Sequence, residues 1–148
     1  MFWNNQQLKP DEIKGTFQLN KSLSNKQIEY LYNSLLELGY ISNNTTLNLF
    51  NDAFSIQISE TKHPIHWLKS NKALAYLLLN LDLKSFITNS YQSGIEKYKL
   101  IKVGSKHKYI DSSSLSTAAS ESRKIPPKES KVLDEIIEKL NTIENPDS

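Results

Sequence analysis

One stretch of the chain, Ile65 to Leu83, limits the possible folds more than any other. It reads IHWLKSNKALAYLLLNLDL and is the most apolar and most sharply started segment of the 148 residues. Ser70 is a good helix N-cap, and the apolar side chains after it cover most of the circumference of a helix over Asn71 to Asn80. A helix that is apolar on nearly all sides is buried on several of them. We therefore expect this helix at the centre of the core, with an extended segment at Ile65 and Trp67 before it.

Two other segments carry the signals of long amphipathic helices. Ser24 to Tyr40 opens with a capping box and follows the i, i+3, i+4, i+7 apolar pattern up to a glycine stop. Lys128 to Leu140 places five apolar side chains on one face, and Leu47 to Phe54 predicts a shorter helix. The three long helices should share one core, because burying a large apolar side chain contributes about 1.5–3 kcal/mol.

The segment from Gly94 to Val103 leaves two interpretations open. Ile95, Tyr98 and Ile101 fit one face of a helix, whereas Tyr98 and Leu100 fit one face of a strand. We favour the helix.

These segments add up to a mainly α fold, a compact helical domain of five to six helices with at most a small β element. A short strand is expected at residues 56–58, a short helix within 82–93, and a loop followed by a short helix within 111–122. The chain should divide into an irregular arm at 1–23, a single helical domain at 24–140 and a frayed tail at 141–148.

Composition excludes several classes of protein. The chain has no cysteine, so it has no disulfide, no thiol nucleophile and no thiolate metal site. Its first residues show no basic region followed by an apolar one, and we expect no signal peptide. The longest apolar run is far shorter than the roughly 20 residues that a membrane span needs. The sequence therefore predicts a cytoplasmic protein without membrane contact.

No catalytic motif is present. The chain has only four glycines and lacks the G-x-S-x-G, G-x-G-x-x-G and P-loop patterns. His63 and His66 are three residues apart, but Pro64 argues against a helix that would bring both to one metal ion, and no third ligand is evident. We expect no enzymatic activity, no cofactor and no metal.

Positive charge is concentrated in one part of the chain. Residues 84–128 hold nine Lys or Arg against three acids, residues 1–83 hold seven of each, and residues 129–148 hold two Lys against six acids. Lysines can neutralise phosphates and release counterions, and the hydroxyls of Ser112, Ser113 and Ser114 can also bind phosphate. The bland alternative is a solvated face, since the whole chain has seventeen lysines and one arginine. The candidate nucleic-acid-binding residues are Lys97, Lys99, Lys102, Lys106, Lys108, Arg123 and Lys124.

A block around the central helix carries a resemblance to known proteins. It consists of a tryptophan, a small turn with serine and a leucine-rich helix: Ile65, Trp67, Leu68, Ser70 and Ala73 to Leu77. Together with the helix that starts at Ser24, the block resembles a group of small Bacteroidetes proteins of unknown function. More distantly, it resembles the C-terminal half of RteC-type regulators from conjugative elements.

The resemblance covers about residues 24–81 and implies a DNA-binding regulator with a winged-helix-like region after the block. Two positions depart from the expected pattern: Lys69 stands in place of a glycine, and Asn71 in place of a lysine. The resemblance assigns no individual residue in the segment 94–122, where the DNA-reading helices would lie.

We expect a non-enzymatic nucleic-acid-associated protein, a transcriptional regulator of a mobile element, with double-stranded DNA as its partner. The alternative is a helical protein-interaction module or adaptor without a nucleic-acid role, which would pair with a protein partner or with itself. Its interface would be the apolar stripe of the last helix, which comprises Val132, Leu133, Ile136, Ile137 and Leu140.

Overall fold

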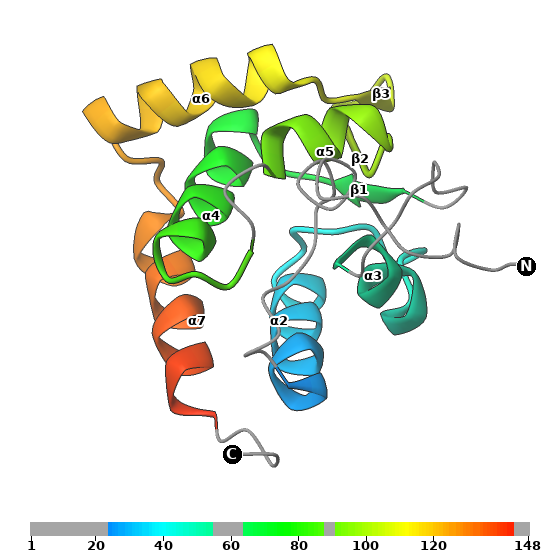
Figure 1. The fold of residues 1–148 in the computed structure, drawn as a ribbon, viewed down its shortest axis with the longest axis vertical. Coiled ribbons are helices and arrows are strands. Elements are labelled where there is room, and N and C mark those ends of the chain that lie inside the picture. The colour runs from blue at the N-terminus through cyan, green and yellow to red at the C-terminus, as the bar shows by residue number, and fades with distance from the viewer. Residues whose placement is uncertain (1–23, 55–63, 88–90, 144–148) are drawn as a thin grey trace, which may run out of the picture.

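The computed structural model describes residues 24–54, 64–87 and 91–143 (Figure 1). The helices in these ranges are α2 (Asn25–Glu37), α3 (Leu47–Phe54), α4 (Asn71–Leu83), α5 (Tyr91–Lys97), α6 (Ser112–Lys124) and α7 (Ser130–Thr142). The strands are β1 (Ile65–Trp67), β2 (Ile101–Val103) and β3 (Lys108–Tyr109). The fold is therefore mainly α with a small β element, as the sequence predicts. The expected arm at 1–23 and the expected strand at 56–58 lie outside the described residues.

Helix α4 lies at the centre of the core, and it packs against both α6 and α7 (Figure 1). It starts after Ser70, whose hydroxyl accepts a hydrogen bond from the amide of Ala73 at 3.1 Å. The indole of Trp67 donates to the Ser70 carbonyl at 2.9 Å, which fixes β1 to the start of the helix. Its inward leucines are almost completely buried: Leu74, Leu77, Leu78 and Leu81. The central position expected from the sequence is confirmed.

Helices α2 and α7 pack against each other and complete the core. The predicted capping box is present, since the Ser24 hydroxyl accepts from the Gln27 amide and the Gln27 side chain accepts from the Ser24 amide. The amide group of Gln27 also donates to the carbonyl of Leu140 at 2.9 Å. One side chain therefore caps the start of α2 and binds a carbonyl in the last turn of α7, which also accepts from the Ile143 amide at 3.4 Å.

The apolar stripe of α7 faces the core of its own chain. Leu133, Ile136, Ile137 and Leu140 are at most 4% exposed, and only Val132 reaches 37%. Pairing with a partner through this stripe was the sequence-based alternative, but four of its five residues are already covered. The helix also continues through Thr142, two residues into the segment expected to fray.

The main error of the sequence-based prediction concerns the small sheet. Strand β1 pairs in parallel with β2, and β2 pairs antiparallel with β3. The helix favoured for residues 94–103 is wrong in its second half: α5 ends at Lys97, Lys99 adopts a left-handed φ of 52°, and Ile101 begins β2. Pairing with β1 overrides the local helical pattern, because it satisfies backbone groups and buries Ile101 at the same time.

Helix α6 is longer than expected. The sequence predicted a loop and then a short helix within residues 111–122, yet α6 begins at Ser112 and runs to Lys124. Asp111 caps it by accepting a hydrogen bond from the amide of Ser114 at 2.7 Å. The helix packs on α4 through small side chains, which permit close approach: Ala75, Ala118 and Ala119.

Within the ranges that the structure describes, no helix combines the length and the apolar character needed to cross a membrane.

Replacing Leu133 by alanine should lower the free energy of unfolding by about 2–5 kcal/mol, because a fully buried leucine leaves a cavity. The matched control is Val132→Ala on the same helix, which should cost about 0.5 kcal/mol or less. Urea denaturation followed by circular dichroism measures both. Equal losses would show that the stripe does not divide into buried and exposed positions.

The hydroxyl of Tyr76 on α4 donates to Asp134 on α7 at 2.7 Å. Burial, followed by the hydrogen bond and the negative charge of Asp134, raises the pKa of Tyr76 from 10.0 to about 12. The folded state thus holds the phenol proton more tightly than the unfolded state, so this stabilisation is complete below pH 10 and is lost as pH rises towards 12. The fall in unfolding free energy between pH 10 and pH 12 should be smaller in Tyr76→Phe than in the wild type. Parallel pH curves for the two proteins would contradict this role.

Candidate nucleic-acid interface

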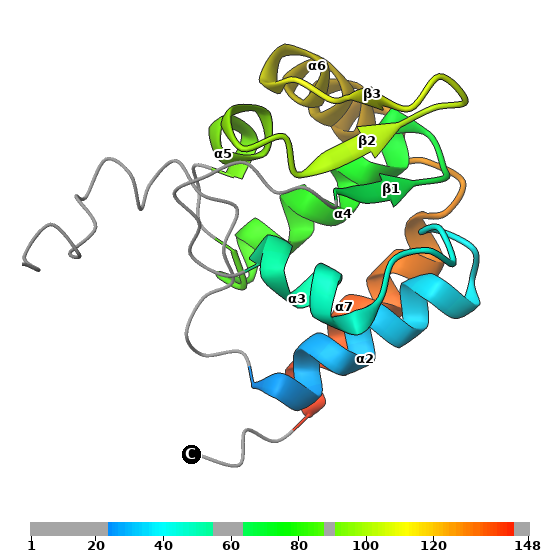
Figure 2. The same ribbon diagram turned by 90° about the vertical axis from the view of Figure 1, so that its right-hand side faces the viewer.

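The register of the small sheet places three polar side chains in a row on its outer face. His66 on β1 is paired with Lys102 on β2, and Lys102 is paired with Tyr109 on β3. The neighbouring residues Ile65 and Ile101 point the other way and are buried, since successive side chains of a strand alternate between faces. Figure 2 shows the three strands side by side with α4 behind them. The outer face of the sheet therefore carries an imidazole, an ammonium group and a phenol ring from three separate segments.

Lysines surround Tyr109. The ammonium nitrogen of Lys102 lies 5.0 Å from the centre of the tyrosine ring, and that of Lys99 lies 5.8 Å from it. Tyr109 as a whole is 44% exposed. Lys106 in the turn and Lys108 on β3 are also exposed. We call this group the hairpin surface: Lys99, Lys102, Lys106, Lys108 and Tyr109, together with His66 and His107.

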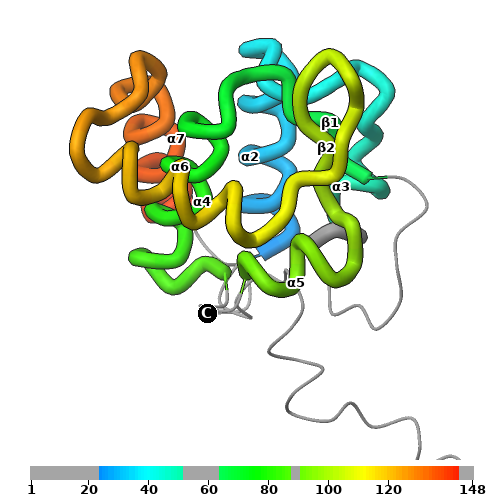
Figure 3. The backbone as a smooth tube through the Cα atoms, turned by 90° about the horizontal axis from the view of Figure 1, so that it is seen from above, coloured from blue at the N-terminus to red at the C-terminus, as the bar shows by residue number. Residues whose placement is uncertain are grey.

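The turn between β2 and β3 holds the two histidines together. Gly104 and His107 have positive φ angles of 76° and 54°, and the His107 amide donates to the Gly104 carbonyl at 3.2 Å. A ring nitrogen of His66 is 3.2 Å from the same carbonyl, and the two imidazole rings have their centres 4.3 Å apart. In Figure 3 this turn lies at the periphery of the molecule. No local pattern predicts this pair, because its members are 41 residues apart in the chain.

Among the described residues, the two histidines are not joined by a third potential metal ligand. No group of three or more His, Cys, Asp or Glu within the described residues could hold a metal ion. His63, the other member of the pair considered from the sequence, lies outside those residues.

Residues 84–128 contain three acidic side chains, and two of them bind the start of helix α6. Glu96 accepts from both the amide and the hydroxyl of Ser112, at 2.7 and 2.9 Å. Asp111 accepts from Ser114, and this hydrogen bond lowers the pKa of its carboxyl group. Carboxylates at a helix N-terminus complement its positive end, so this end of α6 is not a vacant phosphate site. The hydroxyl of Ser112, a phosphate contact suggested by the sequence, is engaged by Glu96.

The structure does not bring all seven predicted lysines and arginines together. Arg123 and Lys124 lie in the last turn of α6, about 17 Å along the helix from its start beside β3, at a rise of about 1.5 Å per residue (Figure 1). Lys97 ends α5 and lies over the ring of Tyr98, 5.2 Å from its centre. The four lysines of the hairpin surface form one group, and Arg123 and Lys124 form another.

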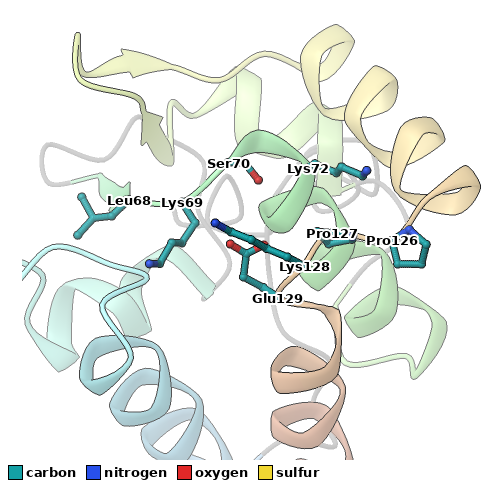
Figure 4. A pocket seen from close by; sticks show the side chains of 8 residues that line it. All are labelled: Leu68, Lys69, Ser70, Lys72, Pro126, Pro127, Lys128 and Glu129. Atoms are coloured by element: carbon teal, nitrogen blue, oxygen red, sulfur yellow. The ribbon is translucent and has the colours of Figure 1, made fainter.

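A second basic region was missed by the sequence analysis. Lys69, Lys72 and Lys128 help to line an open groove of about 600 Å³ between the start of α4 and the connection from α6 to α7 (Figure 4). Glu129 also lines the groove. Burial of Tyr40 raises the pKa of its hydroxyl, and the negative charge of Glu129 raises it further. Lys69 lies over the same tyrosine ring, 5.4 Å from its centre. Because a carboxylate sits among its lysines, this groove is less suited to a polyanion than the hairpin surface.

Comparison with known proteins finds no significant match to this chain among family models, curated proteins or solved structures. The resemblance to RteC-type regulators therefore stays a prediction.

The conformation of Gly104 sets the shape of the hairpin turn. A Cβ atom there would meet nothing within 4 Å, so the cost of a side chain comes from the backbone alone. Gly104→Ala should lower the free energy of unfolding by about 1–2 kcal/mol, the usual penalty of a left-handed conformation. Gly104→Asn should cost less, because asparagine tolerates this region. Urea denaturation of both variants checks the order, and a larger loss for asparagine would contradict it.

Proposed function

We propose that this chain is a non-enzymatic nucleic-acid-binding protein whose hairpin surface contacts backbone phosphates. The observation that carries the proposal is the gathering of four lysines around the β2–β3 hairpin, while Glu96 and Asp111 are bound to the start of α6. The exposed ammonium groups of Lys106 and Lys108 can therefore contact a polyanion. Lysines that neutralise phosphates release counterions, and this release supplies most of the affinity of sequence-independent binding.

The residue types on the hairpin surface favour positioning over base reading. Phosphate contacts fix a protein on nucleic acid but carry no sequence information. Reading a base edge in the major groove usually requires Arg, Asn or Gln, and the segment 97–109 contains none of them. The protein should therefore bind with weak sequence preference through this surface, and Arg123 and Lys124 would supply a separate contact.

The proposal extends to a transcriptional regulator of a mobile element that binds double-stranded DNA. It is supported by the resemblance of residues 24–81 to RteC-type regulators, which implies a winged-helix-like region after that block. Helices α4 and α5 followed by the β2–β3 hairpin have the element order of such a region, although β1 pairs in parallel with β2 here.

An adaptor role through α7 has less support. Its proposed interface would have to leave the core before it could meet a partner, because Leu133 and Leu140 are completely buried.

Replacing Lys102, Lys106 and Lys108 together by glutamine tests the proposal. Binding to a duplex of about 20 base pairs is measured by fluorescence anisotropy across a range of salt concentrations. If the three lysines each neutralise one phosphate, the slope of log K against log salt should become about 2.7 units less steep, since each contact contributes about 0.9. Lys99 is left unchanged because its backbone is left-handed.

A matched control removes the same number of charges elsewhere. Lys26, Lys84 and Lys131 are exposed and lie on or at the ends of α2, α4 and α7, away from the hairpin. Their triple glutamine variant should keep the slope of the wild type. Equal effects of the two triple variants would mean that net charge alone drives binding, and an absence of salt-dependent binding by the wild type would refute the proposal.

A further inference from the structure

We propose that the outer face of the sheet binds unpaired nucleotides by stacking bases on Tyr109 and on the His66–His107 pair. This inference rests on the proposed function and specifies its ligand: a single strand, or an unpaired stretch next to a duplex. It is carried by the row of side chains that crosses the three strands, which puts aromatic rings and ammonium groups side by side.

The rings form two separate platforms. Tyr109 stands on β3 and His66 on β1, with the strand of Lys102 between them, and His107 reaches His66 from the β2–β3 turn. Neighbouring strands are about 4.8 Å apart, so the backbones that carry Tyr109 and His66 are separated by about 10 Å. This separation suits bases that have been splayed apart rather than two bases that remain stacked on each other. Single-stranded nucleic acid is bound in this way by other domains that carry aromatic side chains on a sheet.

The lysine ammonium groups around the rings can contact the phosphate groups of a bound strand. Lys102 lies between the platforms, and Lys99 flanks Tyr109 on the same face. Lys106 is exposed in the hairpin turn, whereas Lys108 is paired with Val103 and points to the opposite face of the sheet. A strand whose bases lie on the rings would therefore have its phosphates within reach of several ammonium groups, as in the positively charged grooves that follow a single-stranded backbone.

The exposure of Tyr109 favours unpaired over paired nucleic acid. A phenol ring that only filled space would be expected in the core, where Tyr91 and Tyr98 are at most 4% exposed, but Tyr109 is 44% exposed. In an intact duplex the faces of the bases are covered by their neighbours, and an enzyme or binding protein reaches them only after unstacking. A flat ring on a protein surface can meet a base face only where the base is already free.

The test compares two variants of Tyr109 on two kinds of ligand. The probes are a single-stranded oligothymidylate of about 12 nucleotides, the corresponding oligouridylate and a blunt DNA duplex, within the site sizes known for single-strand-binding domains. Tyr109→Leu keeps an apolar side chain but removes the aromatic face, and Tyr109→Phe keeps that face. The leucine variant should bind both single strands about 5- to 150-fold more weakly, and the phenylalanine variant should bind them as the wild type does. Neither variant should change binding to the duplex.

A second measurement does not depend on any substitution. In the wild-type chain, the ring protons of Tyr109, His66 and His107 should shift upfield in NMR spectra when oligothymidylate is added, because a stacked base shields them. A difference between the affinities for oligodeoxyuridylate and oligouridylate, which carry the same base, would distinguish DNA from RNA as the strand that this surface favours.

The possible failures are distinguishable. If neither single strands nor the duplex bind in a salt-dependent way, the proposed function itself is refuted. If both bind, but Tyr109→Leu weakens them equally or not at all and the ring protons do not shift, only the stacking inference is overturned.

Discussion

The burial of α4 on several sides is the constraint on which the rest of the structure depends. A helix with leucines and alanines around most of its circumference cannot be covered by one neighbour, so α6 and α7 each take a part of its surface. Each buried leucine contributes about 1.5–3 kcal/mol, which exceeds the differences in local propensity along the chain. A helix that packs on α4 therefore does not need a strong helical pattern in its own sequence. Helix α6, in which serine and alanine are the main residue types, is an example.

This constraint explains which parts of the fold could be predicted from the sequence. Helices α2, α4 and α7 have caps or apolar stripes within a dozen consecutive residues, and such local signals are legible in one sequence. Strand β2 has no such signal. It forms because Ile101 lies next to Ile65, 36 positions earlier in the chain, and the sequence alone does not state that these residues meet. Pairing between distant segments is the information that periodicity cannot supply.

For the candidate site, too, the local features could be predicted from the sequence and the contacts between distant residues could not. The density of lysines after residue 96 identified the segment, and four of those lysines do surround the hairpin. The sequence could not show that Arg123 and Lys124 would lie at the far end of a helix, because a loop was expected where α6 begins. It also could not show that the rings of His66 and His107 would lie in contact, because they meet only through the parallel pairing of β1 with β2.

The core and the candidate site are linked by the register of the sheet. In a strand, a shift of one residue moves every side chain to the opposite face. If β2 were displaced by one position against β1, Lys102 would point into the core and Ile101 would point to solvent, which would leave an unpaired charge buried. The burial of Ile65, Trp67 and Ile101 beneath the sheet therefore fixes His66 and Lys102 on its outer face. The apolar face that packs the sheet onto the core also determines which side chains the hairpin surface presents, so the core and the candidate site depend on the same strand register.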